Sequence, residues 1–402
     1  MNKRAKIKRQ IIKQLYFNKS CSSTELSIEL NKSIPFVNGV ISELVEENIL
    51  EVKGLASSKG GRRPVLYCIK PELLYIASIA VDQFETKMAI YDLHNNVVDE
   101  IKTFNLRLVP GSKQDLVLLT EAIVDFIDHH SIKKDKILGV GVSMPGFVDV
   151  TNQVNHTFFY HPNKSIVQYM ESEIDLPVLI DNDSSLVALA ELKFGQAQNV
   201  RNAMTLNLGW GIGLGMILDN NIFRGSKGYA GELSHIPLFD NKKICQCGKR
   251  GCLETESSLL ILVDQVKELI DTQGLEIKGW HDSISEPDAL NLIMNEIKSG
   301  HSSLIHLLTS IGYTLGRGVS ILMHLLNPST IILSGRGASL SKLWTAPIQQ
   351  AINEHCIPKI AENIEIVISE LGKDATLLGA ATLVIEKYDK LSKFESRTSI
   401  IQ

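Results

Sequence analysis

The most diagnostic segment of this chain reads Gly231-Glu232-Leu233-Ser234-His235 and continues further on as Cys245-Gln246-Cys247-Gly248-Lys249-Arg250-Gly251-Cys252-Leu253-Glu254. Three thiolates and one imidazole form a complete tetrahedral shell for Zn²⁺, with no position left for a catalytic water. The alternative is a set of unrelated core cysteines, but buried cysteines seldom cluster beside glycines in this way. We therefore expect structural Zn²⁺ as the cofactor, with the ligands His235, Cys245, Cys247 and Cys252.

The same segment carries a family resemblance. Residues 230–235 and the cysteine knuckle, residues 245–254, are similar to motifs of the ROK family of sugar kinases and sugar-responsive repressors, and the similarity extends over roughly residues 75–385. The resemblance implies an α/β body of two lobes with the actin/hexokinase-like (ribonuclease H-like) fold. We place the first lobe at residues 73–183, completed by a C-terminal helix at 374–390, and the second lobe, with the zinc knuckle, at 184–373.

Length and composition are those of an ordinary soluble protein. The 402 residues predict two or three domains, and 44% of them are hydrophobic and 21% charged. No apolar run approaches the roughly 18 residues that a membrane-spanning helix needs, and no apolar segment follows the basic N-terminus as in a signal peptide. Three of the six cysteines lie in the knuckle and the rest are scattered, which suits a reducing compartment. We expect a cytoplasmic protein that does not bind a membrane.

Charge is distributed unevenly along the chain. Residues 1–63 contain 12 Lys/Arg and 6 Asp/Glu, a net charge of +6, whereas the whole chain has a net charge of −4 and the remainder therefore −10. A small basic segment on an acidic body indicates that the basic segment binds a polyanion.

Residues 1–70 have the pattern of a winged helix-turn-helix. The run Ser22-Ser23-Thr24-Glu25 is a capping box that starts a second helix, and Ser33 is expected to cap a third. The third helix has an apolar stripe opposite a face of small or polar residues. Such a face fits the major groove of double-stranded operator DNA and offers hydrogen-bonding groups to base edges. The expected DNA contacts on this helix are Ser33, Pro35, Asn38 and Ser42.

Two short strands around a basic loop, within residues 49–69, predict the wing. The loop segment Gly60-Gly61-Arg62-Arg63-Pro64 is similar to the Gly-Arg-Pro core of minor-groove hooks, in which an arginine enters a narrow A·T-rich groove. We expect Lys59, Arg62 and Arg63 to contact DNA. The alternative for residues 1–70 is a three-helix protein-interaction module with a solvated basic loop.

Polar residues just before the expected start of the second lobe, and others within that lobe, mark a candidate sugar site. Asn182 and Asp183 follow the apolar run at residues 177–180, at the strand end where open α/β sheets bind ligands, although a helix cap is the simpler explanation for this pair alone. With one imidazole nitrogen on zinc, the other nitrogen of His235 can donate to a sugar hydroxyl. The family resemblance assigns sugar contacts to Gly146, Asn182, Asp183, Glu232, His235 and Glu254.

Both phosphate loops depart from the kinase pattern. ROK kinases carry Asp-x-Gly-Gly-Thr-Lys where this chain has Asp82-Gln83-Phe84-Glu85-Thr86-Lys87. Phe84 adds bulk where the backbone must approach phosphate, and Glu85 adds a repulsion of roughly 1–4 kcal/mol at about 4 Å. The second loop, Gly-Thr-Gly in kinases, is Gly209-Trp210-Gly211 here, and the glycines that follow are explained equally well by tight strand packing. Asp183 would be the catalytic base only if a nucleotide were admitted.

These patterns together predict a sugar-responsive transcriptional regulator, a repressor in carbohydrate metabolism, that binds operator DNA and a sugar or sugar phosphate. A homodimer or higher homo-oligomer is expected because one recognition helix reads only a half-site. The first alternative is an ATP-dependent hexose or N-acetylhexosamine kinase with a fused DNA-binding head, so the enzyme question stays open with a non-enzyme favoured. The second alternative is a zinc-stabilised regulator that has lost its ligand and binds a protein partner.

Overall fold

The computed structural model describes residues 3–57, 63–340 and 342–390, which divide into two compact units. The first unit comprises the described parts of Met1–Asp181 and Leu377–Gln402, and the second comprises those of Asn182–Thr376. Helices accompany two five-stranded mixed sheets, so the predicted α/β class is confirmed. The division into domains 1–70, 73–183 and 184–373 stays a prediction. Within the described residues, no helix combines the length and apolarity that crossing a bilayer requires.

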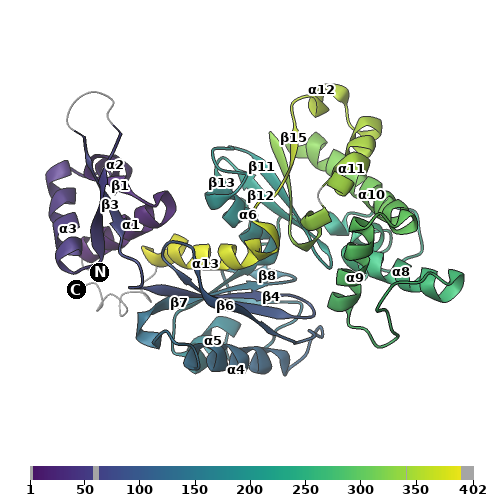
Figure 1. Cartoon of the computed structure of the whole chain (residues 1–402), viewed down its shortest axis with the longest axis horizontal. Coiled ribbons are helices and arrows are strands. Elements are labelled where there is room, and N and C mark those ends of the chain that lie inside the picture. The colour runs from purple at the N-terminus through teal and green to yellow at the C-terminus, as the bar shows by residue number, and fades with distance from the viewer. Residues whose placement is uncertain (1–2, 58–62, 341, 391–402) are drawn as a thin grey trace. The chain divides into compact units, whose positions relative to one another are not determined.

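The first unit begins with a small module of three helices and a three-stranded sheet in the order β1-β3-β2 (Figure 1). Ser22 and Glu25 form the predicted capping box at the start of α2, with the Glu25 N–H donating to Ser22 Oγ at 3.3 Å. Ser33 is the N-cap residue of α3, but its side chain makes no cap hydrogen bond. Pro35 removes one of the two N–H groups, at the second and third helical positions, that such a side chain can bind. The elements of this module are α1 (Lys3–Asn18), β1 (Cys21–Ser22), α2 (Ser23–Leu30), α3 (Ile34–Glu46), β2 (Leu50–Leu55) and β3 (Val65–Ile69).

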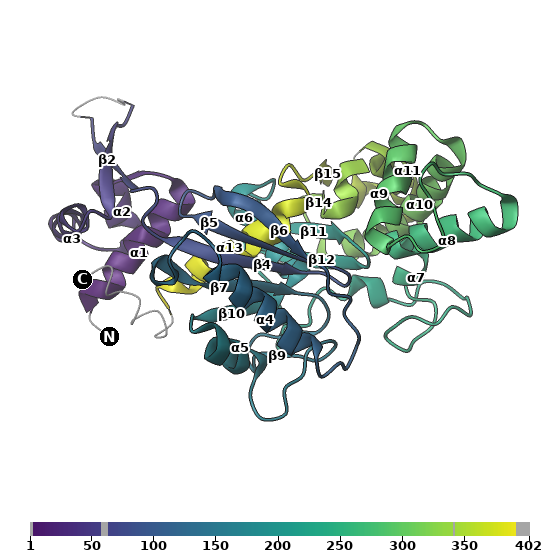
Figure 2. The same cartoon turned by 60° about the horizontal axis from the view of Figure 1, so that its bottom comes forward.

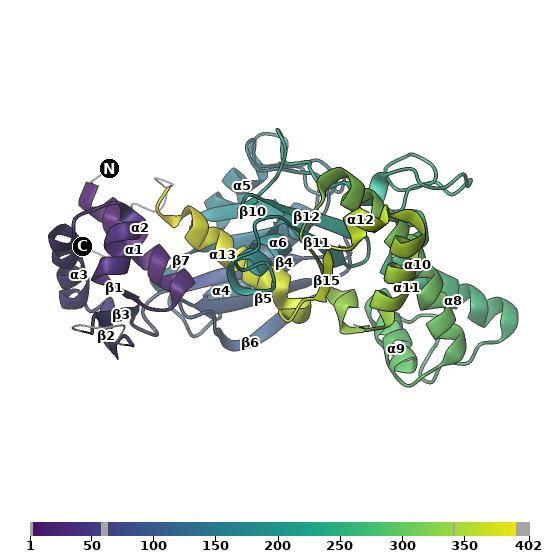
Figure 3. The ribbon, with the colours of Figure 1, turned by 90° about the horizontal axis from the view of Figure 1, so that it is seen from above.

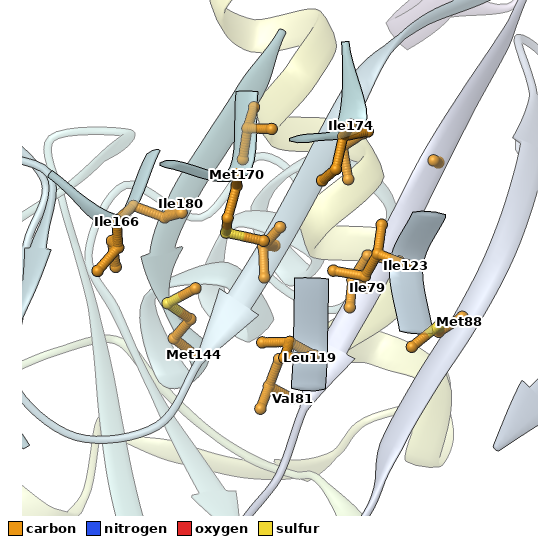
Figure 4. Packing of buried hydrophobic residues seen from close by; sticks show 14 of the residues in the cluster. Ile79, Val81, Met88, Leu119, Ile123, Met144, Ile166, Met170, Ile174 and Ile180 are labelled. Carbon is orange, nitrogen blue, oxygen red and sulfur yellow. The ribbon is translucent and has the colours of Figure 1, made fainter. Parts of the chain in front are cut away.

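A five-stranded sheet in the order β10-β7-β4-β5-β6 forms the rest of the first unit. β4, β5 and β6 are an antiparallel meander, whereas β7 runs parallel to β4. α4 and α5 cover one face of the sheet (Figure 2), and Figure 4 shows part of the apolar core between them. α13 covers the other face, where Ser78 Oγ donates to the Leu377 carbonyl at 2.6 Å (Figure 1). The elements are β4 (Tyr75–Val81), β5 (Thr86–Asp92), β6 (Val97–Phe104), α4 (Asp115–Asp128), η1 (Lys134–Lys136), β7 (Ile137–Met144), β8 (Val148–Asp149), β9 (Val154–Asn155), α5 (Ile166–Ile174), β10 (Val178–Asn182) and α13 (Ala375–Tyr388).

The second unit repeats this topology. Its sheet has the order β13-β12-β11-β14-β15, with β11 antiparallel to β12 and parallel to β14. α10 packs along α11 beside this sheet (Figures 1 and 3). The elements are α6 (Asp183–Phe194), β11 (Ala203–Leu208), β12 (Ile212–Leu218), β13 (Asn221–Ile222), η2 (Leu233–His235), α7 (Glu254–Ser257), α8 (Leu259–Gln273), α9 (Glu286–Lys298), α10 (Ser302–Leu326), β14 (Thr330–Ser334), η3 (Arg336–Leu340), α11 (Lys342–His355), α12 (Pro358–Ala361), β15 (Glu365–Ile368) and η4 (Gly372–Asp374).

Candidate functional site

The junction of β10 and α6 provides the first polar residues of the site. Asn182 ends the strand and Asp183 begins the helix. The Asn182 side chain accepts hydrogen bonds from the backbone N–H groups of Ser184 (3.0 Å) and Ser185 (3.2 Å), so Asn182 is the helix cap that the sequence also allowed. The cap fixes the orientation of the Asn182 amide at the positive end of the helix dipole.

Asp183 is held by groups from both the helix and the sheet. Its Oδ1 accepts hydrogen bonds from the Ser184 N–H (2.7 Å) and the Ser184 hydroxyl (3.1 Å), and its Oδ2 accepts one from Asn207 Nδ2 (3.3 Å). Asn207 lies on β11 and is nearly buried. Sequence analysis missed Asn207, whose only signal is an amide side chain in a strand of otherwise largely apolar residues.

Glycines of β12 bring the sheet close to α6. A Cβ atom on Gly213 would lie 1.7 Å from Ser184 Oγ, and one on Gly215 would lie 2.4 Å from Ala188 Cβ. Any side chain at these positions would push α6, and with it Asp183, away from Asn207. For these two glycines, tight packing of strand and helix is therefore the explanation that the structure supports.

Two further carboxylates lie near Asp183. Glu232 immediately precedes η2, and Glu254 begins α7. Burial, followed by the negative charges of Asp183 and Glu254, raises the pKa of Glu232 to about 7, although 39% of its side chain is exposed. The three predicted site residues thus form one cluster of hydrogen-bond acceptors, which suits a ligand rich in hydroxyl groups.

The four predicted metal ligands come together beside this cluster. Their ligand atoms all lie within 4.8 Å of one another, with Cys245 Sγ 3.5 Å from His235 Nδ1 and Cys247 Sγ 3.7 Å from Cys252 Sγ. Burial raises the pKa of the Cys245 thiol to about 12, so an ion bound here would displace a proton. The other imidazole nitrogen, Nε2 of His235, is 3.7 Å from Glu232 Oε2. This cluster can hold a metal ion and at the same time orient the imidazole toward the carboxylates.

Bulky side chains occupy the loops that sequence analysis compared with phosphate loops. In the second unit, Trp210 is buried and its ring lies 5.2 Å from the guanidinium carbon of Arg336. In the first unit, Phe84 is buried with the Arg107 guanidinium 5.0 Å from its ring centroid, and its N–H donates to Asp82 Oδ1 at 3.0 Å. Both loops are packed with the chain's own aromatic and cationic side chains.

The remaining predicted site residues belong to the first unit. Gly146 belongs to the first unit, and local packing accounts for it, since a Cβ atom there would lie 2.6 Å from Thr157 Cβ. In the N-terminal module, Ser33, Pro35, Asn38 and Ser42 of the α3 region and Arg63 of the wing are all exposed. Lys59 and Arg62 lie outside the described residues.

The chain is similar to repressors over nearly its whole length. It is 29% identical over 384 residues to a protein named xylose repressor from Caldicellulosiruptor bescii, which covers 93% of this chain and 94% of the relative. A solved structure described as a ROK family transcriptional regulator, a homolog of the E. coli MLC protein, matches with a TM-score of 0.76 and 24% identity, covering 99% of each chain.

Solved structures of sugar kinases match a shorter part of this chain. A ROK family glucokinase from Streptomyces griseus, solved in complex with glucose and AMPPNP, has a TM-score of 0.65 and 24% identity, covering 77% of this chain and 98% of the kinase. At such identities both structures show a shared fold. The sequence model of the ROK family itself matches residues 79–387, which is well over half of the chain. The carboxylate cluster, the cysteine knuckle and nearly all of the two five-stranded sheets lie within these residues, and the chain belongs to the ROK family.

Proposed function

We propose that the protein is a sugar-responsive transcriptional repressor, active in the cytoplasm, that binds operator DNA with its N-terminal module and a sugar at the carboxylate cluster. One observation carries the proposal: similarity to a xylose repressor extends over 93% of the chain, whereas likeness to a glucokinase covers 77%. A sugar kinase does not require a basic module of three helices and a wing, and a repressor does.

The ligand of the carboxylate cluster is proposed to be a neutral sugar rather than a sugar phosphate. Asp183, Glu232 and Glu254 accept hydrogen bonds from hydroxyl groups. Burial is the main cause of the raised pKa of Glu232, and the negative charges of Asp183 and Glu254, which raise it further, would also repel a phosphate. His235 Nε2 and the Asn182 amide add donors beside these acceptors. Because relatives are named xylose repressors, D-xylose is the first sugar to test.

Zinc is the proposed metal of the His/Cys cluster. Zn–S bonds of about 2.3 Å and Zn–N bonds of about 2.0–2.1 Å at tetrahedral angles give S···S distances of about 3.8 Å and S···N distances of about 3.6 Å. The distances of 3.7 Å between Cys247 and Cys252 and 3.5 Å between Cys245 and His235 match these values. Zinc bound here would clamp the knuckle and fix the imidazole of His235 toward the sugar.

Nucleotide binding is disfavoured by the packed loops. A Phe84 ring against Arg107 and a Trp210 ring against Arg336 stand where kinases keep small residues. Phosphate groups could approach the backbone of either loop only if the aromatic side chain of that loop left its buried position, so we propose a sensor and not a kinase. The alternative, an ATP-dependent sugar kinase, is tested by measuring ADP release over a panel of sugars. Turnover of about 1 s⁻¹ or faster would overturn the sensor proposal.

The decisive experiment selects duplexes from a random pool with the full-length protein and then measures the effect of sugars on binding. We expect a sequence-preferring duplex with two half-sites bound by a homodimer, and a change in its affinity of at least about tenfold with one sugar among D-xylose, D-glucose and N-acetyl-D-glucosamine. Glu232→Gln should abolish the sugar effect without changing affinity for the duplex in the absence of sugar. Selection that yields no preferred sequence would refute the proposal.

A further inference from the structure

The outward face of α3 has a composition that restricts which bases it can recognise. Val37, Val40, Ile41 and Leu44 are buried against the module, as the helical spacing requires. The opposite face exposes a continuous row of small, apolar and amide side chains. This row consists of Ile34, Pro35, Asn38, Ser42 and Val45.

This face carries no cation although the module is basic, and in the last turn of α3 it exposes one carboxylate, that of Glu46. Residues 34–46 contain no Lys or Arg, and Glu43 is engaged by both Arg4 and Lys8, on the side of α3 that meets α1. Glu47, just beyond the helix, also pairs with Lys8. The net charge of +6 in residues 1–63 therefore complements the phosphates of DNA without placing a cation on the α3 face itself.

The absence of cations from α3 determines the readout. In the major groove, guanine is most often read by a bidentate Arg or Lys, adenine by a bidentate Asn or Gln, and thymine by apolar contact with its methyl group. Within the exposed row, Asn38 alone offers an amide donor and acceptor side by side, while Ile34 and Pro35 offer apolar surface one turn earlier. The large exposed fraction of Ile34, 42%, is consistent with a contact made outside the module.

The spacing of these residues matches that of neighbouring base pairs. Residues three and four apart on a helix are separated by about 4.5–6 Å along its axis, and base pairs are stacked about 3.4 Å apart. Asn38 and the pair Ile34/Pro35 can therefore contact base pairs one or two steps apart.

We propose, on the basis of the proposed DNA-binding function, that α3 reads A·T base pairs: Asn38 pairs with an adenine, and Ile34 and Pro35 contact a thymine methyl group one or two base pairs away. Each operator half-site then contains an adenine at one defined position and an A·T pair next to it or one step further. The same composition excludes bidentate contacts of Arg or Lys from α3 to guanine.

The test uses the full-length protein and the preferred duplex found by selection. All four base pairs are placed in turn at each half-site position, and affinities are compared for the wild type, Asn38→Ala and Lys32→Ala. Lys32 is exposed immediately before α3 and serves as the matched control, because a lysine that meets only phosphate weakens binding to all sequences equally. Replacing thymine by deoxyuridine removes only the methyl group.

The wild type should prefer adenine at one position of each half-site by about tenfold or more, and Asn38→Ala should remove this preference while leaving the others intact. Lys32→Ala should lower all affinities by the same factor. Deoxyuridine at the neighbouring pair should weaken the wild type several-fold and should weaken Ile34→Ala less, because only Pro35 then still contacts the methyl group. A G·C preference at these positions, or an adenine preference that survives Asn38→Ala, would overturn the inference while leaving DNA binding in place. A complete lack of sequence preference would overturn the proposed function as well.

Discussion

Gly251→Ala is expected to weaken zinc binding far more than Gly248→Ala, although both glycines belong to the same knuckle and both have a positive φ, 71° and 83°. A non-glycine residue in this left-handed region costs about 1–2 kcal/mol at either position. The two sites differ in their surroundings. A Cβ atom on Gly248 meets nothing within 4 Å, whereas one on Gly251 would lie 1.9 Å from the Phe239 carbonyl oxygen, a backbone atom that cannot rotate away.

The overlap at Gly251 lies where backbone hydrogen bonds join the knuckle to residues 238–239, which precede it in the sequence. The Gly251 carbonyl accepts hydrogen bonds from the N–H groups of Leu238 (2.9 Å) and Phe239 (3.1 Å), and the next residue is the ligand Cys252. Relieving the overlap moves Cys252 away from the other ligands, at an additional cost of about 1–3 kcal/mol for an overpacked site. Because metal binding here is coupled to folding of the knuckle, that difference corresponds to a loss of about 5- to 150-fold in zinc affinity relative to Gly248→Ala.

The assay is competition for zinc with a chromophoric chelator, applied to the wild type and both variants, with metal content measured by mass spectrometry. Circular dichroism establishes that both variants retain the helices of the body. Equal zinc affinity of Gly251→Ala and Gly248→Ala would show that the Phe239 backbone can move away at little energetic cost, and that the packing argument for the knuckle is wrong.

Three other changes test the remaining parts of the site. His235→Ala should remove both the metal and the response to sugar while leaving affinity for the operator duplex in place; zinc retained at full stoichiometry would contradict the shared role of the imidazole. Lowering the pH should weaken zinc binding, because burial raises the pKa of the Cys245 thiol to about 12 in the metal-free chain and zinc must displace that proton. The apparent zinc affinity, measured between pH 8 and pH 6, should fall about tenfold per pH unit for each proton released. A zinc affinity that does not change with pH would contradict this expectation. Phe84→Gly combined with Glu85→Gly should increase ATP affinity in isothermal titration, and no increase would show that these two residues are not what excludes the nucleotide.

Periodicity and local chemistry were sufficient to predict much of the N-terminal module and of the sheets. The capping box at Ser22 and Glu25 depends only on contacts within one turn, and the apolar stripe of α3 follows from helical spacing, so both are present as expected. The two short strands expected around a basic loop within residues 49–69 correspond to β2 and β3, which pair antiparallel. The members of the His/Cys cluster could be named in advance because three of them lie within eight residues and carry distinctive side chains.

The rest depended on contacts between residues far apart in the chain. The sequence alone could not show that Asn207 supports the Asp183 carboxylate, since 24 positions separate them and only the packing of α6 against β11 and β12 brings them together. Likewise, the reason for glycine at Gly213 lies in Ser184 of another element, and the raised pKa of Glu232 arises from burial and from charges on two other segments. Local sequence determines which elements form and which ligands are available, because those properties depend on neighbouring residues. Tertiary structure decides which carboxylates share one site and how strongly they perturb one another, because burial and electrostatic interaction depend on distance in space.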